Sequence, residues 1–336
     1  MSYGLTYDFR NPLKDRPFVQ LYNQTLEHVV AAESMGFDTI WLTEHHFTDD
    51  GYLPSLMPMA AAIAQRTTRV RIGTDVLLLP LHHPLRVAED GAVLDVLSNG
   101  RFALGVAVGY RPYEFEILGA PIHERGARIA EQLDIITQAW TTGAVSIQGK
   151  HFVYDNVTVT PRPVQAPRPP IYAGGTSRAA LRRAARQSDG LLVPGLGSRE
   201  EYDIYMSEVE ACGKDGAQAS YLCTNIVMHL DRDHNKAWND VKQHILYQEN
   251  VYAQWYLDAG YPELVGRSLA RSPDELNRDA YLVGSPAYVL ERIARHREAV
   301  PYAHMSFWAI LPGQAVAAAM RSLELFASEV LPVLRA

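Results

Sequence analysis

The sequence predicts an α/β fold, a (β/α)₈ TIM-type barrel with insertions after the fourth strand and between the seventh and eighth strands. Short apolar segments alternate with longer amphipathic segments, which is typical of parallel strands joined by crossover helices. Eight such units fit within 336 residues, and this favours a closed barrel over the alternative, an open doubly wound sheet. No linker or repeat interrupts the alternation, so residues 1–336 are predicted to form one domain.

Hydrophobic periodicity and helix-end signals locate the first half of the barrel. Gly36 is expected to close the first helix, because glycine accepts the left-handed conformation that ends many helices. A hairpin over 145–170 is expected to follow the fourth unit. The expected strands are 4–9, 37–42, 69–79 and 101–108, and the expected helices are 18–35, 55–65, 84–97 and 124–141.

The alternation resumes in the second half of the chain. A long helix-prone segment rich in tyrosine separates the last two expected strands, and its part 247–281 is predicted to include a lid over the pocket. The tyrosines and tryptophan of this part suggest an apolar or aromatic substrate. The expected strands are 170–173, 190–194, 221–230 and 304–311, with a helix over 178–187.

Composition excludes several classes of protein. The 31 Lys and Arg against 38 Asp and Glu give a net charge of −7, so no nucleic-acid partner is expected. Two cysteines, Cys212 and Cys223, are too few for a disulfide framework and fit a reducing compartment. The N-terminus does not read as a signal peptide, and the longest apolar runs are too short to span a membrane. We therefore expect a cytoplasmic protein that is an enzyme.

Candidate catalytic groups follow the strands, because barrel enzymes place their sites at the carboxyl ends of the strands. Glu44, His45 and His46 follow the second strand, and His82 and His83 follow the third. Adjacent histidines on extended chain point to opposite sides, so no metal site is predicted despite twelve histidines. Gly-x-Ser-x-Gly and Walker motifs are absent from the sequence, which argues against hydrolase and P-loop chemistry.

A glycine-rich turn after the fifth strand is the clearest candidate for binding an anion. Gly174, Gly175, Thr176 and Ser177 lie between a strand and a helix, where free backbone amides attract phosphate. The same residues also fit an ordinary helix N-cap. A competing turn at 284–286 fits a cap better, because proline favours the first position of a helix. Seven aromatic residues near strand ends are candidates for lining a pocket: Tyr7, Phe9, Trp41, Phe47, Tyr52, Tyr110 and Tyr113.

Several blocks of this sequence resemble bacterial luciferase and its relatives, the flavin-dependent luciferase-like monooxygenases and oxidoreductases. The blocks keep their order and spacing over roughly the first 120 residues, and the stretch around Gly174 extends them. They are LTEHHFTDDG (42–51), IGTDV (72–76), HPLRVAED (83–90), LDVLSNGRF (94–102) and AGGTS (173–177).

This resemblance implies a TIM-type barrel that uses reduced FMN and O₂, usually with a separate flavin reductase, and oxidises a small organic substrate through a peroxyflavin. His45 matches the catalytic histidine, and Glu44 is expected to orient it or to stabilise the strand end. The family commonly forms dimers through its second and third helices, so a homodimer is expected. The positions that match flavin contacts are Thr74, Asp75 and Val76, where the family has a non-proline cis peptide, together with Ala107, Tyr110, Gly174, Gly175, Thr176 and Ser177.

One position departs from the family pattern. Val108 stands where luciferase has an arginine that contacts the flavin phosphate, and Arg178 is a candidate replacement. A branch of the same family uses a deazaflavin coenzyme for hydride transfer without oxygen. This departure keeps a deazaflavin-dependent oxidoreductase open as the alternative function. A flavin-binding homologue without turnover is a third interpretation.

Overall fold

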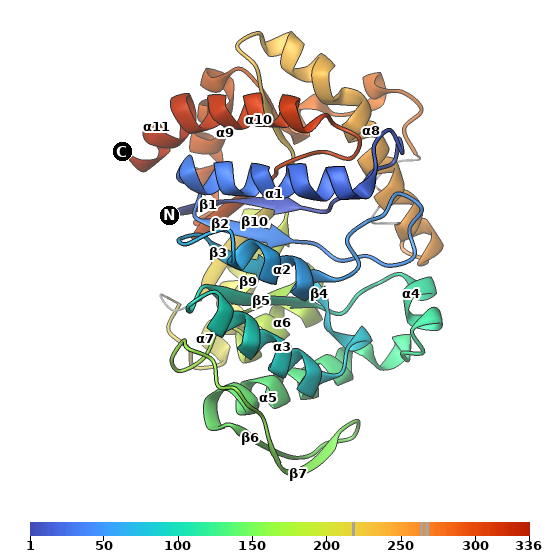
Figure 1. Cartoon of the computed structure of the whole chain (residues 1–336), viewed down its shortest axis with the longest axis vertical. Coiled ribbons are helices and arrows are strands. Elements are labelled where there is room, and N and C mark those ends of the chain that lie inside the picture. The colour runs from blue at the N-terminus through green and yellow to red at the C-terminus, as the bar shows by residue number, and fades with distance from the viewer. Residues whose placement is uncertain (217–218, 263–264, 266–268) are drawn as a thin grey trace.

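The computed structural model describes residues 1–216, 219–262, 265 and 269–336. Its parallel strands close into an eight-stranded barrel, because every strand of the barrel pairs with a neighbour on each side (Figure 1). The predicted (β/α)₈ fold is confirmed. The barrel strands are β1 (Ser2–Tyr7), β2 (Thr39–Leu42), β3 (Arg71–Thr74), β5 (Phe102–Ala107), β8 (Ile171–Gly174), β9 (Gly190–Pro194), β10 (Ser220–Ile226) and β13 (His304–Trp308).

Helices surround the barrel and bury one face each against it (Figure 1). Helix α1, for example, buries Leu21, Leu26, Val29 and Ala32, which recur at helical spacing. None of the helices among the described residues is long and apolar enough to cross a membrane. The surrounding helices are α1 (Phe18–Ser34), α2 (Leu56–Ala64), α3 (Pro84–Leu97), α5 (Arg125–Thr142), α6 (Arg178–Gln187), α7 (Arg199–Ala211), α9 (Pro286–Ala299), α10 (Val316–Leu325) and α11 (Leu331–Arg335).

Two excursions leave the regular alternation. After β5 the chain forms the short helix α4 (Pro112–Ile117), then α5, and then an antiparallel hairpin of β6 (Ala144–Gln148) and β7 (Val153–Thr158). Between β10 and β13 lie β11 (Met228–Leu230), the long helix α8 (His234–Asp258) and β12 (Leu282–Gly284). Trp238, Val241 and Ile245 anchor α8 in a separate apolar cluster with Val283 and Trp308.

Two sequence-based expectations about strands were wrong, and a helix was missed. The expected strand 69–79 ends at Thr74, and a cis peptide between Asp75 and Val76 separates β3 from the short strand β4 (Leu77–Leu78). The expected strand 221–230 leaves the barrel after Ile226, because Asn225 adopts a positive φ of 59° and β11 then pairs with β12 in its own sheet. Helix α7 was not predicted.

The barrel interior is filled by side chains. Trp41, Ala103, Leu192 and Leu222 form a buried cluster between opposite strands. Gly73 on β3 is required there, since a Cβ atom at this position would overlap the Trp41 ring. The indole Nε1 of Trp41 donates a hydrogen bond of 2.9 Å to Nε2 of His304, which is 3% exposed.

His304 makes stability depend on pH. Burial lowers its pKa from 6.5 to about 3, whereas in the unfolded chain it titrates near 6.5. The unfolded state therefore binds one more proton between these values, so the free energy of unfolding falls by about 1 kcal/mol per pH unit as the pH drops from 6.5 towards 3. We expect urea unfolding at pH 5 and pH 7.5, followed by tryptophan fluorescence, to show this loss.

The variant His304→Asn isolates this contribution, since the amide accepts a hydrogen bond without titrating. We expect a shallower dependence of stability on pH below 6.5 than in the wild type. The same change at the exposed His123 is the control and should leave the dependence unaltered. An equal slope in wild type and His304→Asn would contradict the assignment.

Candidate active site

The carboxyl ends of the barrel strands gather the residues that the sequence singled out. Parallel strands bring these ends to one rim. His45 follows β2, Asp75 follows β3, Tyr110 follows β5, and Gly174 ends β8. The rim is therefore the candidate active site.

His45 is held in one orientation at this rim. Its side chain is 8% exposed, and its Nδ1 lies 2.9 Å from Oε1 of Glu114. Because a carboxylate accepts, the proton is assigned to Nδ1, which leaves Nε2 with a free lone pair. Burial lowers the pKa of His45, although Glu114 acts in the opposite direction. A neutral imidazole with a proton-accepting Nε2 results.

Glu114 is the residue that sequence reasoning missed. It lies on α4, its side chain is fully buried, and Oε1 also accepts hydrogen bonds from the His46 amide (2.9 Å) and from Arg111 Nη1 (2.8 Å). Burial alone would raise its pKa, but the bond from His45 and the charge of Arg111 keep the pKa below its usual value. The sequence offered one signal for Glu114. It lies four residues beyond Tyr110, which follows the fourth barrel strand.

Aromatic rings enclose His45. Two come from the rim, Tyr52 and Tyr110, with centroids 4.9 and 5.8 Å from the imidazole. Two come from α8, Tyr252 at 6.1 Å and Trp255 at 4.6 Å. We call these four rings the His45 box. The tyrosine-rich segment thus contacts the candidate catalytic histidine, although 263–264 and 266–268, within the expected lid, lie outside the described residues.

Other aromatic candidates lie elsewhere. Phe47 and Tyr113 are 48% and 52% exposed, and Trp41 is inside the barrel. Tyr256, also on α8, stacks on Tyr110 with centroids 4.6 Å apart. Only part of the expected aromatic lining therefore meets at the site.

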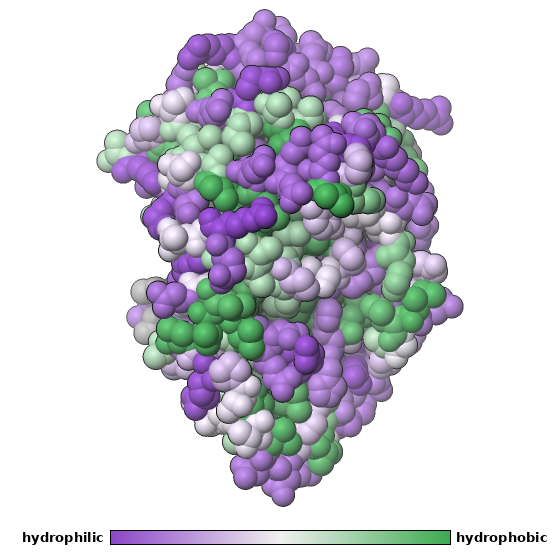
Figure 2. Space-filling view, viewed as in Figure 1, coloured by the Kyte–Doolittle hydropathy of each residue, from purple (hydrophilic) through white to green (hydrophobic). Residues whose placement is uncertain are grey.

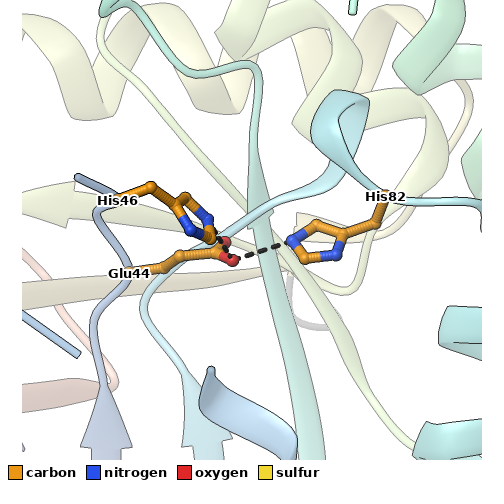
Figure 3. Close-up of side chains that lie close together, drawn as sticks. All are labelled: Glu44, His46 and His82. Atoms are coloured by element: carbon orange, nitrogen blue, oxygen red, sulfur yellow. Dashed lines mark hydrogen bonds and ion pairs between the residues drawn. The ribbon is translucent and has the colours of Figure 1, made fainter. Parts of the chain in front are cut away.

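Glu44 does not use its carboxylate to orient His45. Its Oε1 lies 3.0 Å from Nε2 of His46 and 2.8 Å from Nε2 of His82 (Figure 3). Its Oε2 accepts a hydrogen bond from the amide of Leu78. Burial would raise its pKa, but the two imidazoles outweigh burial and lower it to about 2. His45 and His46 do diverge, yet His82 joins His46 from another loop, a convergence that sequence reasoning did not predict.

The segment Thr74 to Val76 connects β3 to β4 at the rim. Thr74 Oγ1 donates to the carbonyl of Gly105 and accepts from its amide, so this side chain bridges β3 and β5. Asp75 is 5% exposed, and burial raises its pKa to about 7 despite a hydrogen bond from Thr224. The expected cis peptide lies between Asp75 and Val76.

The glycine turn forms a narrow cradle beside this segment. A Cβ atom on Gly174 would lie 3.0 Å from Val76 Cγ1 and 3.6 Å from Ala107 Cβ, so three expected cofactor contacts meet here. Gly175 has a φ of 129°, a conformation that suits glycine. Ser177 caps α6 by accepting a bond from the Ala180 amide at 3.3 Å, and Thr176 is exposed. At the competing turn, Ser285 caps α9 in the same way.

Unpaired buried polar atoms test whether this rim fits a cofactor with a polar edge. Among the described residues, several side-chain atoms that follow the strands have no hydrogen-bond partner in the protein, and a bound ligand would supply partners. These atoms are Asp75 Oδ2, Tyr110 Oη, Glu114 Oε2 and Asn225 Oδ1. Together with the cradle, they fit a phosphate-bearing planar cofactor such as a flavin.

Comparison with known proteins agrees with this geometry. The family model described as luciferase-like monooxygenase matches residues 1–303. The oxygenase component of a flavin-dependent trigonelline monooxygenase from Acinetobacter baylyi is 27% identical over 330 residues, covering 93% of this chain and 90% of that protein. The crystal structure of monooxygenase RslO1 from Streptomyces bottropensis superimposes with a TM-score of 0.86 at 25% identity, covering 99% and 100% of the two chains.

Two other relatives have names that describe different activities. The alkanal monooxygenase alpha chain of the Kryptophanaron alfredi symbiont is 30% identical over 230 residues, 67% of this chain and 62% of that one. An F420-dependent glucose-6-phosphate dehydrogenase from Amycolatopsis mediterranei is 29% identical over 231 residues, covering 65% and 68% of the two chains. A further relative, from Sinorhizobium fredii, is matched over 49% of its own length, so this chain spans about half of it.

Proposed function

The chain belongs to the luciferase-like monooxygenase family, a family of oxidoreductases, and from this premise we propose that it uses reduced FMN and O₂ to oxidise a small, largely apolar organic substrate. The observation that carries the proposal is the state of His45. It is neutral, oriented by Glu114 and enclosed by the His45 box, at the same rim of the barrel as the Gly174 cradle. Residues 1–336 act as one barrel domain in this proposal.

The bound reduced flavin would supply two electrons to O₂, so that one oxygen atom enters the substrate and the other leaves as water. Gly174, Gly175, Thr176 and Ser177 would hold the phosphate at the start of α6. Thr74, Asp75, Val76, Ala107 and Tyr110 would line the place of the ring system.

The protein's own part is to position a base and exclude water. Nε2 of His45 accepts a proton during the reaction and returns it later. Glu114 and Arg111 act as positioning residues, because they fix the ring through Nδ1. The rings of Tyr252 and Trp255 cover His45 and provide an apolar surface for the substrate.

Two further parts of the proposal concern partners and location. A separate flavin reductase would deliver the reduced cofactor, which is supported by the trigonelline relative being named an oxygenase component. A cytoplasmic location is supported by both cysteines being free.

The competing function is a deazaflavin-dependent oxidoreductase, favoured by the F420-dependent relative and by Val108 at the position of a phosphate-binding arginine. A titration of the purified protein with oxidised FMN, anaerobically reduced FMN and coenzyme F420 separates the two. Preference for reduced FMN supports the monooxygenase. Tight binding of F420 without FMN binding would replace oxygenation with hydride transfer, and binding of neither would overturn both.

A homodimer through α2 and α3 is also proposed. Val93, Val96 and Leu97 on α3 are 42%, 46% and 44% exposed, and apolar patches lie over α3 on the face that Figure 2 shows. We expect light scattering after size exclusion to give twice the mass of the chain, and Val96→Glu to give a monomer. The control is Val19→Glu on α1, at a residue 75% exposed, which should remain dimeric. A monomeric wild type would contradict this proposal.

A further inference from the structure

A second group of ligand-type side chains lies beside the candidate active site. Glu44 and His46 come from the loop that follows β2, and His82 comes from the loop before α3. Figure 3 shows both imidazoles turned towards the same carboxylate. One carboxylate oxygen and one nitrogen of each histidine lie within 4.8 Å of one another.

The donor set and its spacing suit a transition-metal ion. Two imidazole nitrogens and one carboxylate oxygen are ligands that Zn²⁺ and its neighbours accept. Around Zn²⁺, with bonds of about 2.0–2.1 Å, donor atoms lie about 3.3 Å apart. The two oxygen–nitrogen separations here are 3.0 and 2.8 Å, and the two nitrogens lie within 4.8 Å. To reach this spacing, each oxygen–nitrogen distance would lengthen by a few tenths of an ångström. The two imidazole nitrogens would approach each other by up to about 1.5 Å.

The chain permits these shifts and gives an ion access. The His82 side chain is 31% exposed and that of His46 is 12% exposed, whereas the Glu44 side chain is fully buried. His82 is therefore the ligand on the solvent side, and Glu44 is the buried one. Three protein ligands also leave a coordination position open.

Glu44 needs positive charge nearby. A buried carboxylate is costly unless it is paired, and none of the ion pairs among the described residues joins Glu44 to a lysine or arginine. Its partners are the two imidazoles and the Leu78 amide. A divalent cation between the three side chains would satisfy this carboxylate and both imidazoles at once.

We propose that Glu44, His46 and His82 bind a divalent transition-metal ion of the Zn²⁺ type. The site is distinct from His45, whose Nδ1 is bonded to Glu114. An ion here would join the loop after β2 to the loop before α3, and it would also act on β4 through the Leu78 amide. The cofactor cradle at Gly174 contributes no ligand to it, so the proposal is independent of the flavin.

The test uses the full chain without flavin, after treatment with a chelator and its removal. Titration calorimetry with Zn²⁺ alone should give one site per chain, and Co²⁺ should give visible ligand-field absorption that Zn²⁺ displaces. We also expect the midpoint of thermal unfolding to rise when Zn²⁺ is added.

Variants assign the ligands. His82→Ala should fold, because the side chain is partly exposed, and should weaken Zn²⁺ binding by about tenfold or more. Glu44→Gln should do the same, and its circular dichroism spectrum reports whether it folds. The matched control is His83→Ala, since the neighbouring His83 bonds to Tyr154 instead. Absence of stoichiometric binding to the wild type, or affinity unchanged by His82→Ala, would overturn the proposal and leave a hydrogen-bonded triad.

Discussion

Replacing His45 with alanine should lower the rate at which enzyme-bound reduced FMN reacts with O₂ by about 10²–10⁴-fold, the usual contribution of a positioned general base. The reason is that Nε2 of His45 is the proton acceptor that Glu114 holds in place. Stopped-flow absorbance after mixing the anaerobic complex with oxygenated buffer measures this rate. Added imidazole should restore part of it in the variant, which a purely structural role would not produce.

Two controls accompany this experiment. Glu114→Gln keeps the shape of the side chain but removes its charge, so we expect a smaller loss, with the affinity for reduced FMN nearly unchanged. His83→Gln changes a histidine outside the site and should react at the wild-type rate. A His45→Ala variant that binds reduced FMN and reacts as fast as the wild type would refute the assigned role.

Filling the cradle should abolish most cofactor binding. In Gly174→Val the new methyl groups would occupy the space against Val76 and Ala107, where even a Cβ atom already lies at 3.0 and 3.6 Å. Val76, Ala107 or the turn itself must move to make room, and all are proposed cofactor contacts. We therefore expect the Kd of reduced FMN to rise by roughly 10- to 100-fold, a loss of about 1.4–2.8 kcal/mol of binding free energy. Anaerobic fluorescence titration measures this change.

The matched control is Gly126→Val, at an exposed helical glycine with open space around it. It should bind reduced FMN as the wild type does. Circular dichroism shows whether each variant remains folded. If a folded Gly174→Val variant bound reduced FMN with unchanged affinity, the assignment of the phosphate site to this turn would be wrong.

The fold was largely predictable because its signals are local. Alternating apolar strands and amphipathic helices mark each barrel unit, and they located the eight strands of the barrel. Helix α7 was missed although a local signal exists. Ser198 and Glu201 have the Ser-x-x-Glu spacing typical of a helix start, and Ser198 Oγ accepts a hydrogen bond from the Glu201 amide. The end of β3 at Thr74 and the departure of the chain after Ile226 depend on backbone geometry that apolar periodicity does not report.

The site was predictable only where one segment carries it. His45 and the turn at Gly174 are recognisable from their own neighbours in sequence. Glu114 is 69 positions from His45 and His82 is 38 positions from Glu44, so their pairing exists only after the barrel closes. The resemblance therefore pointed to the candidate base and left Glu44 either to orient it or to stabilise the strand end. In the structure Glu114 contacts His45, and Glu44 accepts a hydrogen bond from the Leu78 amide on β4.

Oε1 of Glu114 accepts three hydrogen bonds, and these bonds restrict the length that the loop after β5 can have. Surface loops usually tolerate insertions and deletions. The connection after β5 is different, because Glu114 must reach both the His45 ring and the His46 backbone in the loop after β2. A residue added between Gly109 and Glu114 would rotate or shift that carboxylate and release the histidine. Length variation among relatives should therefore concentrate in places such as the β6–β7 hairpin and avoid this short connection.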